Sequence, residues 1–297
     1  MRSLLPLLIL TSSHFPLPTN AAQSCNNHPE LCPRQYSNIS QIGTHDSPFI
    51  GLLPQDNQDL SLPSQLNAGI RFLQAQTHAD PFGTLNLCHT SCFEEDAGSL
   101  ETYLTTIKSW LDTNPNEVLT LLLVNGDNLD IDIFDAAFTS SGIKPYAYIP
   151  PTTPLAISAW PTLGEMITAA TRLVIFLDAG AKPSVPYILD EFTYFFETPY
   201  DTTDPTFPEC KIDRPPGASP EGRMYIVNHF LDVDVFGIDM PDDAADGATN
   251  AKTGRGSISA QVELCVGLYG RAPVGVLVDY FERGDVFGAQ NALNGLG

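Results

Sequence analysis

Short apolar runs of the kind that form buried strands alternate with amphipathic segments along most of the chain. The most uniform run is 118–124, which reads Val-Leu-Thr-Leu-Leu-Leu-Val and is typical of a strand buried on both faces. Between 98 and 114, apolar residues recur at three- and four-residue steps and predict an amphipathic helix. Helices are also predicted around 131–139 and near 162–170. The remaining predicted strands lie at 40–44, 70–76, 85–89, 172–177, 224–227 and 274–278.

This alternation of strands and helices determines the expected fold class. Apolar strands that are separated by helices are typical of parallel sheets covered on both faces. The pattern alone leaves open whether the sheet closes into a barrel or stays open. Two stretches rich in Pro and Asp, 198–222 and 239–256, are expected to be long loops rather than linkers between domains. We therefore expect one α/β domain.

The N-terminus has the composition of a secretory signal peptide. A basic start precedes the apolar run 4–10, and the small residues Ala21 and Ala22 follow a polar stretch. The apolar run is far shorter than the roughly 20 residues that a membrane span needs. We expect residues 1–22 to be a cleaved signal peptide, residues 23–297 to form the mature domain, and the protein to be secreted to the extracellular space.

All six cysteines lie beyond the predicted signal peptide. An even number of cysteines in an exported chain favours disulfides. The alternative is a zinc site that includes Cys88, His89 and Cys92, which an oxidising compartment disfavours. Six cysteines allow many pairings, and the spacing here suggests Cys25–Cys32, Cys88–Cys92 and Cys210–Cys265.

Composition and charge narrow the class of protein further. Hydrophobic residues make up 43% of the chain and aromatic residues 9%, which is enough for a large core. The 35 acidic residues outnumber the 14 basic residues, and the net charge is −21. A surface of this charge repels nucleic acid and anionic membranes. We therefore expect no nucleic-acid partner, at most peripheral membrane contact, and a monomer that its charge keeps in solution.

Polar residues follow several of the predicted strands, and their positions predict the functional site. In parallel α/β folds, active residues gather at the carboxyl ends of the strands. Here those ends carry His45-Asp46, Gln76-Thr77-His78, His89 and Asp279. A single histidine at such a place is more often structural than catalytic, but four strand ends of this kind indicate one convergent site.

Five segments occur in a fixed order: Gly43-Thr44-His45-Asp46-Ser47, Ala68-Gly69-Ile70-Arg71-Phe72, Leu87-Cys88-His89, Asn114-Pro115-Asn116-Glu117-Val118 and Val276-Leu277-Val278-Asp279-Tyr280-Phe281. With this order the chain resembles the catalytic X-domain of phosphatidylinositol-specific phospholipase C, and most closely the secreted fungal-type phospholipase-C-like phosphodiesterases. The resemblance extends from about residue 36 to the end. It implies a distorted TIM-type (β/α)8 barrel in a single domain, and phosphoric diester hydrolysis without a metal or other cofactor.

The resemblance also implies roles for the two histidines. His45 is then the general base that deprotonates an attacking hydroxyl, and His89 the general acid that protonates the leaving alcohol. His45 and Asp46 are neighbours on a segment expected to be extended, so their side chains point in different directions and each histidine needs another carboxylate. A closed barrel brings the last strand beside the first, and Asp279 next to His45. Asp46 is then free to orient His89, as the resemblance also implies.

The second strand departs from the family pattern. Bacterial relatives carry an arginine there that neutralises the phosphate, and intracellular eukaryotic relatives carry acidic residues that bind calcium, whereas this chain has Gln74 and Gln76. Amide oxygens alone make a poor calcium site. Gln74, Gln76 and His78 share one face of the strand and are expected to contact the substrate. Arg71 points away from this face, and Arg172 begins its strand, at the opposite end of the barrel.

The substrate is the least determined part of the prediction. Tyr200 lies in the region where bacterial relatives stack a tyrosine under the inositol ring, and a packed loop tyrosine is the alternative. The leading hypothesis is cleavage of phosphatidylinositol-like or other polyol phosphodiesters, soluble or lipid, by acid–base catalysis with two histidines. The alternatives are a catalytically impaired binding protein for a phosphorylated polyol or glycan, and a glycerophosphodiester hydrolase, whose metal carboxylates have no match at Gln74 and Gln76.

Overall fold

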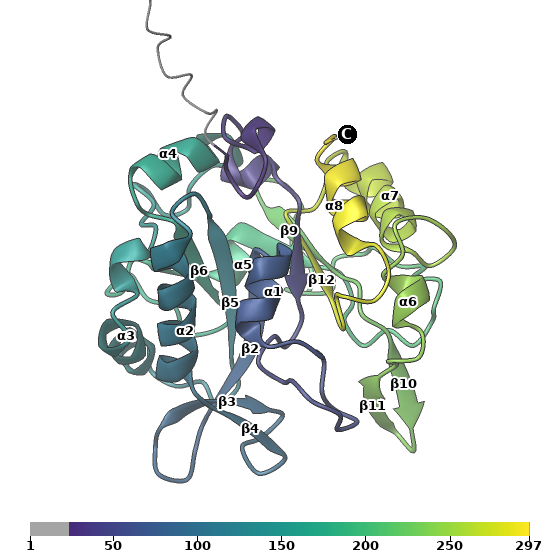
Figure 1. Ribbon diagram of the computed structural model, residues 1–297, viewed down its shortest axis with the longest axis horizontal. Coiled ribbons are helices and arrows are strands. Elements are labelled where there is room, and N and C mark those ends of the chain that lie inside the picture. The colour runs from purple at the N-terminus through teal and green to yellow at the C-terminus, as the bar shows by residue number, and fades with distance from the viewer. Residues whose placement is uncertain (1–23, 297) are drawn as a thin grey trace, which may run out of the picture.

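The computed structural model describes residues 24–296. The predicted signal peptide, residues 1–22, lies outside the described residues. Eight parallel strands curl around a filled lumen, and helices cover their outer face (Figure 1). The predicted single-domain, distorted TIM-type α/β fold is confirmed. No helix within 24–296 combines the length and the apolar composition needed to cross a membrane.

The eight parallel strands are β1 (Gln41–Thr44), β2 (Phe72–Ala79), β5 (Leu119–Asn125), β6 (Leu173–Leu177), β7 (Ile188–Asp190), β8 (Phe195–Glu197), β9 (Met224–Asn228) and β12 (Gly275–Val278). Across the sheet they follow the order β7-β6-β5-β2-β1-β12-β9-β8, and each neighbouring pair runs parallel. β7 and β8 are the two ends of this order and do not pair with each other. The sheet is therefore a curled half-barrel rather than a cylinder closed by hydrogen bonds.

Two hairpins project from the strand ends. β3 (Leu85–His89) pairs antiparallel with β2, and β4 (Glu95–Ser99) pairs antiparallel with β3. β10 (Asp232–Val235) and β11 (Ile238–Pro241) form a separate antiparallel pair. The expectation of a uniformly parallel series is therefore wrong at 85–89. The turn 80–84 is too short for the crossover that a parallel neighbour requires, so the chain can only fold back as a hairpin.

The helices are α1 (Leu62–Ala68), α2 (Leu100–Thr113), α3 (Ile131–Ser140), α4 (Leu163–Thr168), α5 (Glu191–Tyr194), α6 (Asp246–Thr249), α7 (Ile258–Tyr269) and α8 (Val286–Leu293), with 3-10 turns at Pro29–Leu31, Tyr36–Asn38, Lys144–Tyr146 and Ile157–Ala159. The predicted helices correspond to α2, α3 and α4. The segment 198–222 contains no helix or strand, as predicted. The segment 239–256 is not a loop throughout, because it contains most of β11 and all of α6. Elements of four residues give no periodic signal in a sequence.

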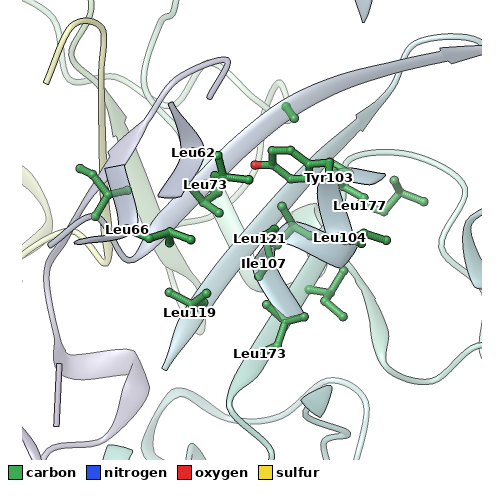
Figure 2. Packing of buried hydrophobic residues seen from close by; sticks show 14 of the residues in the cluster. Leu62, Leu66, Leu73, Tyr103, Leu104, Ile107, Leu119, Leu121, Leu173 and Leu177 are labelled. Atoms are coloured by element: carbon green, nitrogen blue, oxygen red, sulfur yellow. The ribbon is translucent and has the colours of Figure 1, made fainter. Parts of the chain in front are cut away.

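Side chains that alternate along each strand divide the core into two layers. On β5, Leu119, Leu121 and Leu123 face the helices, while Leu122, between the last two, faces the lumen. Figure 2 shows Leu119 and Leu121 beside Leu104 and Ile107 of α2. The continuous apolar run therefore reflects burial on both faces of the sheet, because no face of these strands meets water.

The lumen is filled below its mouth. Phe72 of β2 is fully buried there, and the next two strands in the sheet, β1 and β12, present glycines to it. A Cβ at Gly43 would lie 2.8 Å from the Phe72 Cβ, and a Cβ at Gly275 would lie 2.5 Å from its ring. Because the ring occupies the space of these missing Cβ atoms, the lumen below it is closed. The polar residues at the strand ends are therefore confined to the carboxyl end of the barrel.

Three disulfides join the cysteines in the predicted pairs, Cys25–Cys32, Cys88–Cys92 and Cys210–Cys265. The third fastens the long 198–222 segment to α7. The zinc alternative at Cys88 and Cys92 is wrong, because their sulfur atoms are bonded to each other.

Candidate active site

His45 follows directly after β1 and is paired with Asp279, which follows β12. The two strands lie side by side in a register that places Thr44 opposite Val278. The Nδ1 atom of His45 is 2.9 Å from Oδ1 of Asp279. The second carboxylate oxygen of Asp279 accepts a hydrogen bond from Asn57 at 3.1 Å. The predicted pairing of His45 with Asp279 is thus present in the structure.

Asp46 lies between the two candidate histidines. Its Oδ2 atom is 3.5 Å from Nε2 of His45 and 3.6 Å from Nε2 of His89. The expectation that His45 and Asp46 point apart is therefore wrong. The backbone of Asp46 is not extended but has a φ of 42°, which turns its carboxylate back beneath both rings. The Asp46 carboxylate thus lies within ion-pair distance of both imidazoles.

The two glutamines of β2 hold Asp46 in this conformation. The Asp46 backbone N–H donates to Oε1 of Gln74 at 2.6 Å, and Nε2 of Gln76 donates to Oδ2 of Asp46 at 2.7 Å. Asp46 is fully buried. The glutamine amides therefore fix the carboxylate of the site.

His89 reaches the site on the β2–β3 hairpin. β2 continues past the barrel mouth to Ala79, and β3 returns antiparallel with Leu87 opposite Thr77, so the last residue of β3 comes back to the mouth. The Cys88–Cys92 disulfide closes the loop that follows, and Cys88 is fully buried. Phe49 contacts the His89 ring edge-to-face, with centroids 5.1 Å apart. The disulfide and this ring contact together restrict the position of the imidazole.

A cavity of about 180 Å³ opens beside His45 at the mouth of the barrel. Gln74, Gln76 and Tyr200 line it, as predicted. His78 does not, because its ring lies against Gly126 and its Nδ1 is 2.9 Å from Oδ1 of Asp127. His89 lines a neighbouring depression of about 260 Å³. The two histidines therefore face two adjoining spaces, with Asp46 between them.

The cavity also contains a cation that the sequence interpretation missed. Arg214 lines it, donates to Oε2 of Glu197 at 2.9 Å through Nε, and lies over the Tyr200 ring at 4.6 Å. Arg214 comes from the 198–222 segment and pairs with the edge of β8 through a backbone bridge at Glu197. The sequence around Arg214 lacks the alternation of apolar and polar residues that is typical of a strand, so it does not predict this bridge. The disulfide at Cys210 is the one sequence signal that this loop is fixed to the domain.

Glu191 and Glu197 add buried carboxyl groups to the same cavity. Burial raises the pKa of Glu191 well above its ordinary value, and the neighbouring Glu197 raises it further. Glu191 therefore keeps its proton to a higher pH than an ordinary carboxyl group, while Glu197 is paired with Arg214 and accepts from Asn228 at 3.1 Å. These groups present both hydrogen-bond donors and acceptors to a polar ligand.

The other two arginines considered from the sequence are remote from the cavity, as expected. Nε of Arg71 donates to Glu117 at 2.7 Å. Arg172 donates to the backbone carbonyls of Leu111, Asn114 and Glu117. Both side chains are thus occupied at the amino end of the strands.

The carboxylates determine the charge of His45. Burial alone would lower the pKa of His45, but Asp46 and Asp279 outweigh burial and raise it to about 9. Burial raises the pKa of nearby Asp232 to about 7. In the free protein at neutral pH, His45 is therefore an imidazolium held between two carboxylates, and it must lose a proton before it can act as a base.

The donor set does not fit a calcium ion. Among residues 24–296, no three His, Cys, Asp or Glu side chains are arranged to hold a metal. The amides of Gln74 and Gln76 stand where carboxylates would be needed, and both are hydrogen-bonded to Asp46. Calcium requires several oxygen ligands with carboxylates among them.

Comparisons with known proteins agree with this architecture. A family model described as PI-PLC X 1 matches residues 31–294. The "PI-PLC X domain-containing protein 1" of Arthroderma benhamiae is 53% identical over 292 residues, which cover 98% of this chain and 95% of that protein. An "Uncharacterized secreted protein" of the same organism is 43% identical over 94% of this chain, which spans 64% of that protein.

Solved structures share the fold at low sequence identity. The phosphatidylinositol-specific phospholipase C of Listeria monocytogenes superposes with a TM-score of 0.56 at 18% identity, over 90% of this chain and 96% of that one. A mutant of the corresponding Staphylococcus aureus enzyme gives a TM-score of 0.55 at 16% identity, over 90% of this chain and 95% of that one.

Proposed function

The chain belongs to the PI-PLC X family, and from this premise we propose that it is a phosphoric diester hydrolase that uses His45 and His89 as its acid–base pair and needs no metal. The observation that carries the proposal is the pairing of each imidazole with a buried carboxylate: His45 with Asp279 at 2.9 Å, and His89 with Asp46 at 3.6 Å. A carboxylate behind an imidazole fixes its orientation and stabilises its charged form.

In the proposed first step, His45 takes the proton of a hydroxyl group next to the phosphodiester. Its Nδ1 is occupied by Asp279, so Nε2 is the accepting atom. The hydroxyl oxygen bonds to phosphorus, the bond to the leaving oxygen breaks, and His89 gives that oxygen a proton. The products are a cyclic phosphodiester and a free alcohol. In a second step water attacks, and the two histidines exchange roles.

The cavity beside His45 supports a polyol as the group that carries the attacking hydroxyl. Arg214 and Glu197 supply a charged donor and acceptor, and Tyr200 supplies an aromatic face. Sugars and cyclic polyols bind through such groups because their hydroxyls donate and accept while their C–H faces are apolar. We therefore propose phosphatidylinositol-like or other polyol phosphodiesters as substrates.

The experiment is phosphorus NMR of the purified protein with phosphatidylinositol and with glycerophosphoinositol, in the presence and absence of EDTA. We expect a cyclic phosphate that forms despite the chelator and is absent with His45→Ala and with His89→Ala. His78→Ala is the matched control, because His78 is paired with Asp127 outside the cavity, and it should turn over at the wild-type rate. Activity that disappears with EDTA would favour the glycerophosphodiester hydrolase instead.

A binding protein is the second candidate, and one observation favours it. No arginine or lysine is among the residues that line the depression beside His89, where the phosphate would approach. Loss of transition-state stabilisation at phosphate costs on the order of 10²–10³ in rate for a single donor. If the wild type binds glycerophosphoinositol without turnover in either condition, the binding protein is the correct function.

We propose an extracellular location. A relative that is 43% identical is named a secreted protein, and three disulfides join all six cysteines. Disulfides of this kind persist in oxidising compartments.

A further inference from the structure

A second cavity, of about 130 Å³, lies at the amino end of the barrel strands. The 26–28 segment, Gly69 after α1, the start of β1 and helix α8 enclose it. Figure 1 shows α8 and the purple N-terminal segment at the upper end of the molecule, and the two hairpins at the lower end. No residue that lines this amino-end cavity also lines the cavity beside His45. The two cavities are therefore separate.

The first donor in the amino-end cavity belongs to Gln41. This residue begins β1, and only 4% of its surface is exposed. Its Oε1 atom accepts a hydrogen bond from Oγ1 of Thr120 at 3.3 Å. Its Nε2 atom has no hydrogen-bond partner among residues 24–296. Because Gln41 lines the cavity, this amide is available to a molecule that enters it.

Arg71 and Gln290 supply two further donors. Arg71 is as buried as Gln41; its Nε donates to Glu117 at 2.7 Å and its Nη1 to two backbone carbonyls, while Nη2 has no acceptor in the described part of the chain. The Oε1 atom of Gln290 accepts from the backbone N–H of Ile42 at 2.7 Å, which fixes the orientation of its amide. Its Nε2 atom likewise lacks an acceptor within 24–296. Both residues line the cavity.

The free hydrogen-bonding capacity of these three side chains determines the kind of ligand. The three unpartnered atoms are all donors, and they come from three different segments of the fold. A ligand that satisfies them has to be an acceptor, and oxyanions accept the strongest hydrogen bonds from such groups. Among the described residues, those that line the cavity include no aspartate or glutamate, although 35 acidic residues face 14 basic ones in the whole chain.

The charge of the cavity favours a singly charged ligand. Arg71 is the one arginine or lysine among the described lining residues, and it is already paired with Glu117. A dianion such as phosphate would therefore find little positive charge to balance its own, whereas hydrogen bonds from neutral amides can hold a carboxylate. Leu31, Ile39 and Phe287 add apolar walls, which can cover a short hydrocarbon group.

We propose that the amino-end cavity binds a small monocarboxylic acid. Its carboxylate accepts hydrogen bonds from Gln41, Arg71 and Gln290, and the apolar walls cover its hydrocarbon part. Because the three donors belong to β1, to the segment before β2 and to α8, the bound acid links these segments and stabilises the folded chain. The inference goes beyond the proposed hydrolysis and does not depend on it.

Calorimetric titration of the purified protein with butyrate tests the proposal, and butyramide is the neutral ligand of the same size. We expect butyrate to bind at millimolar concentration and butyramide to bind at least about tenfold more weakly, because charged acceptors form the stronger hydrogen bonds. Gln41→Leu removes one donor without adding charge and should weaken butyrate binding about tenfold.

A matched pair of variants on α8 separates binding in the cavity from a general effect of charge. Asn291 lines the cavity, so Asn291→Asp places a carboxylate of nearly the same shape beside the ligand and should weaken butyrate binding at least about tenfold. Ala292 is exposed and does not line the cavity. Ala292→Asp adds the same charge one residue away, and this variant should bind butyrate like the wild type, because solvent screens an exposed charge.

Several results would overturn the proposal. They are failure of the wild type to bind butyrate, equal binding of butyrate and butyramide, and equal butyrate binding by Asn291→Asp and the wild type. Inorganic phosphate that binds more tightly than butyrate, and more weakly to Asn291→Asp, would identify a phosphate site instead. Butyrate binding that is lost in Arg214→Met and kept in Asn291→Asp would place the acid beside His45. Turnover of glycerophosphoinositol reports on the proposed function alone, so the two proposals can fail separately.

Discussion

The ring of Phe230 lies flat on the imidazole of His45, with centroids 3.7 Å apart and planes inclined by 3°. Phe230 is buried and is the second residue after β9, in the short segment between β9 and β10. Stacking covers one face of the imidazole and restricts the rotation of its ring. The side chain of Phe230 therefore contributes to the orientation of the proposed base.

We expect Phe230→Leu to lower kcat/KM about three- to tenfold, because a stacked aromatic pair contributes about 0.5–1.5 kcal/mol that leucine does not restore. The measurement is turnover of glycerophosphoinositol. Phe207→Leu is the matched control, since Phe207 packs against a buried histidine outside the site, His229, at 4.2 Å. That variant should lose similar stability and keep its turnover. Equal rates for all three proteins would contradict an orienting role for Phe230.

The pH dependence of turnover follows from the charge of His45. Because its pKa is raised to about 9, the basic form is scarce at neutral pH, and kcat/KM should rise with pH up to about 9. Asp279→Asn removes one of the three carboxylates that raise this pKa, so the midpoint should move to lower pH, and the maximal rate should fall. Asp232→Asn should move it less, because Asp232 contributes least among the named carboxylates. A midpoint that is the same in the wild type and in Asp279→Asn would be inconsistent with this account.

The Arg214–Glu197 pair should affect stability asymmetrically. Glu197 is almost fully buried, whereas the side chain of Arg214 is 33% exposed. Arg214→Met leaves a buried carboxylate without its cation and should cost about 2–3 kcal/mol of unfolding free energy, somewhat less than for a fully buried pair. Glu197→Gln should lower the unfolding free energy by a smaller amount, since water can reach the side chain of Arg214. In urea unfolding, the double variant should be more stable than Arg214→Met alone. A double variant whose loss equals the sum of the two single losses would show that the pair is not coupled.

Stability should be greater in mild acid than in mild base. Burial raises the pKa of Asp246 to about 8 and that of Glu95 to about 7, and the carboxylates raise that of His45 to about 9. A group with a raised pKa in the folded state stabilises fully below its unfolded pKa, and this contribution is lost as the pH rises through the folded pKa. Because of all three groups, the unfolding free energy therefore falls as the pH rises from about 5 to about 9.

Burial lowers the pKa of His229. Below the ordinary histidine pKa of 6.5, this group therefore lowers the unfolding free energy as the pH falls, which is opposite to the effect of the other three groups. We therefore expect a maximum of stability in mildly acidic solution. Urea titrations at pH 5.5, 7 and 9 would measure it. Asp246→Asn should flatten the decline toward pH 9, and a wild type that is most stable at pH 9 would contradict the assignment.

The sequence is sufficient to place a site residue where strand order and side-chain chemistry determine its position. His45 and Asp279 were expected to be neighbours because each ends an apolar strand and a curled parallel sheet brings the first strand beside the last. The alternation of apolar runs and helices predicted a parallel α/β sheet, whereas the eight-strand barrel was implied by the family resemblance, because β7 and β8, of three residues each, are too short to give a signal.

The remaining features depend on backbone conformation, which composition does not encode. The double contact of Asp46 follows from one positive φ, and an aspartate adopts that conformation without any change in the sequence pattern. The direction of β3 depends on a turn rather than on its own residues. Arg214 reaches the cavity because a long loop is laid against an edge strand, and no local periodicity predicts that contact.

The two proposed catalytic histidines belong to parts of the fold with different local stability. His45 follows β1, which has strand neighbours on both sides, whereas His89 ends β3 in a hairpin whose outer strand, β4, pairs with β3 alone. Peripheral hairpins open with a smaller free energy than central strands. The acid would therefore leave its position under conditions in which the base and the sheet are still intact. The molecule then has a folded state that retains its ligand cavity and is chemically silent, and recovery from it requires only that one hairpin close again.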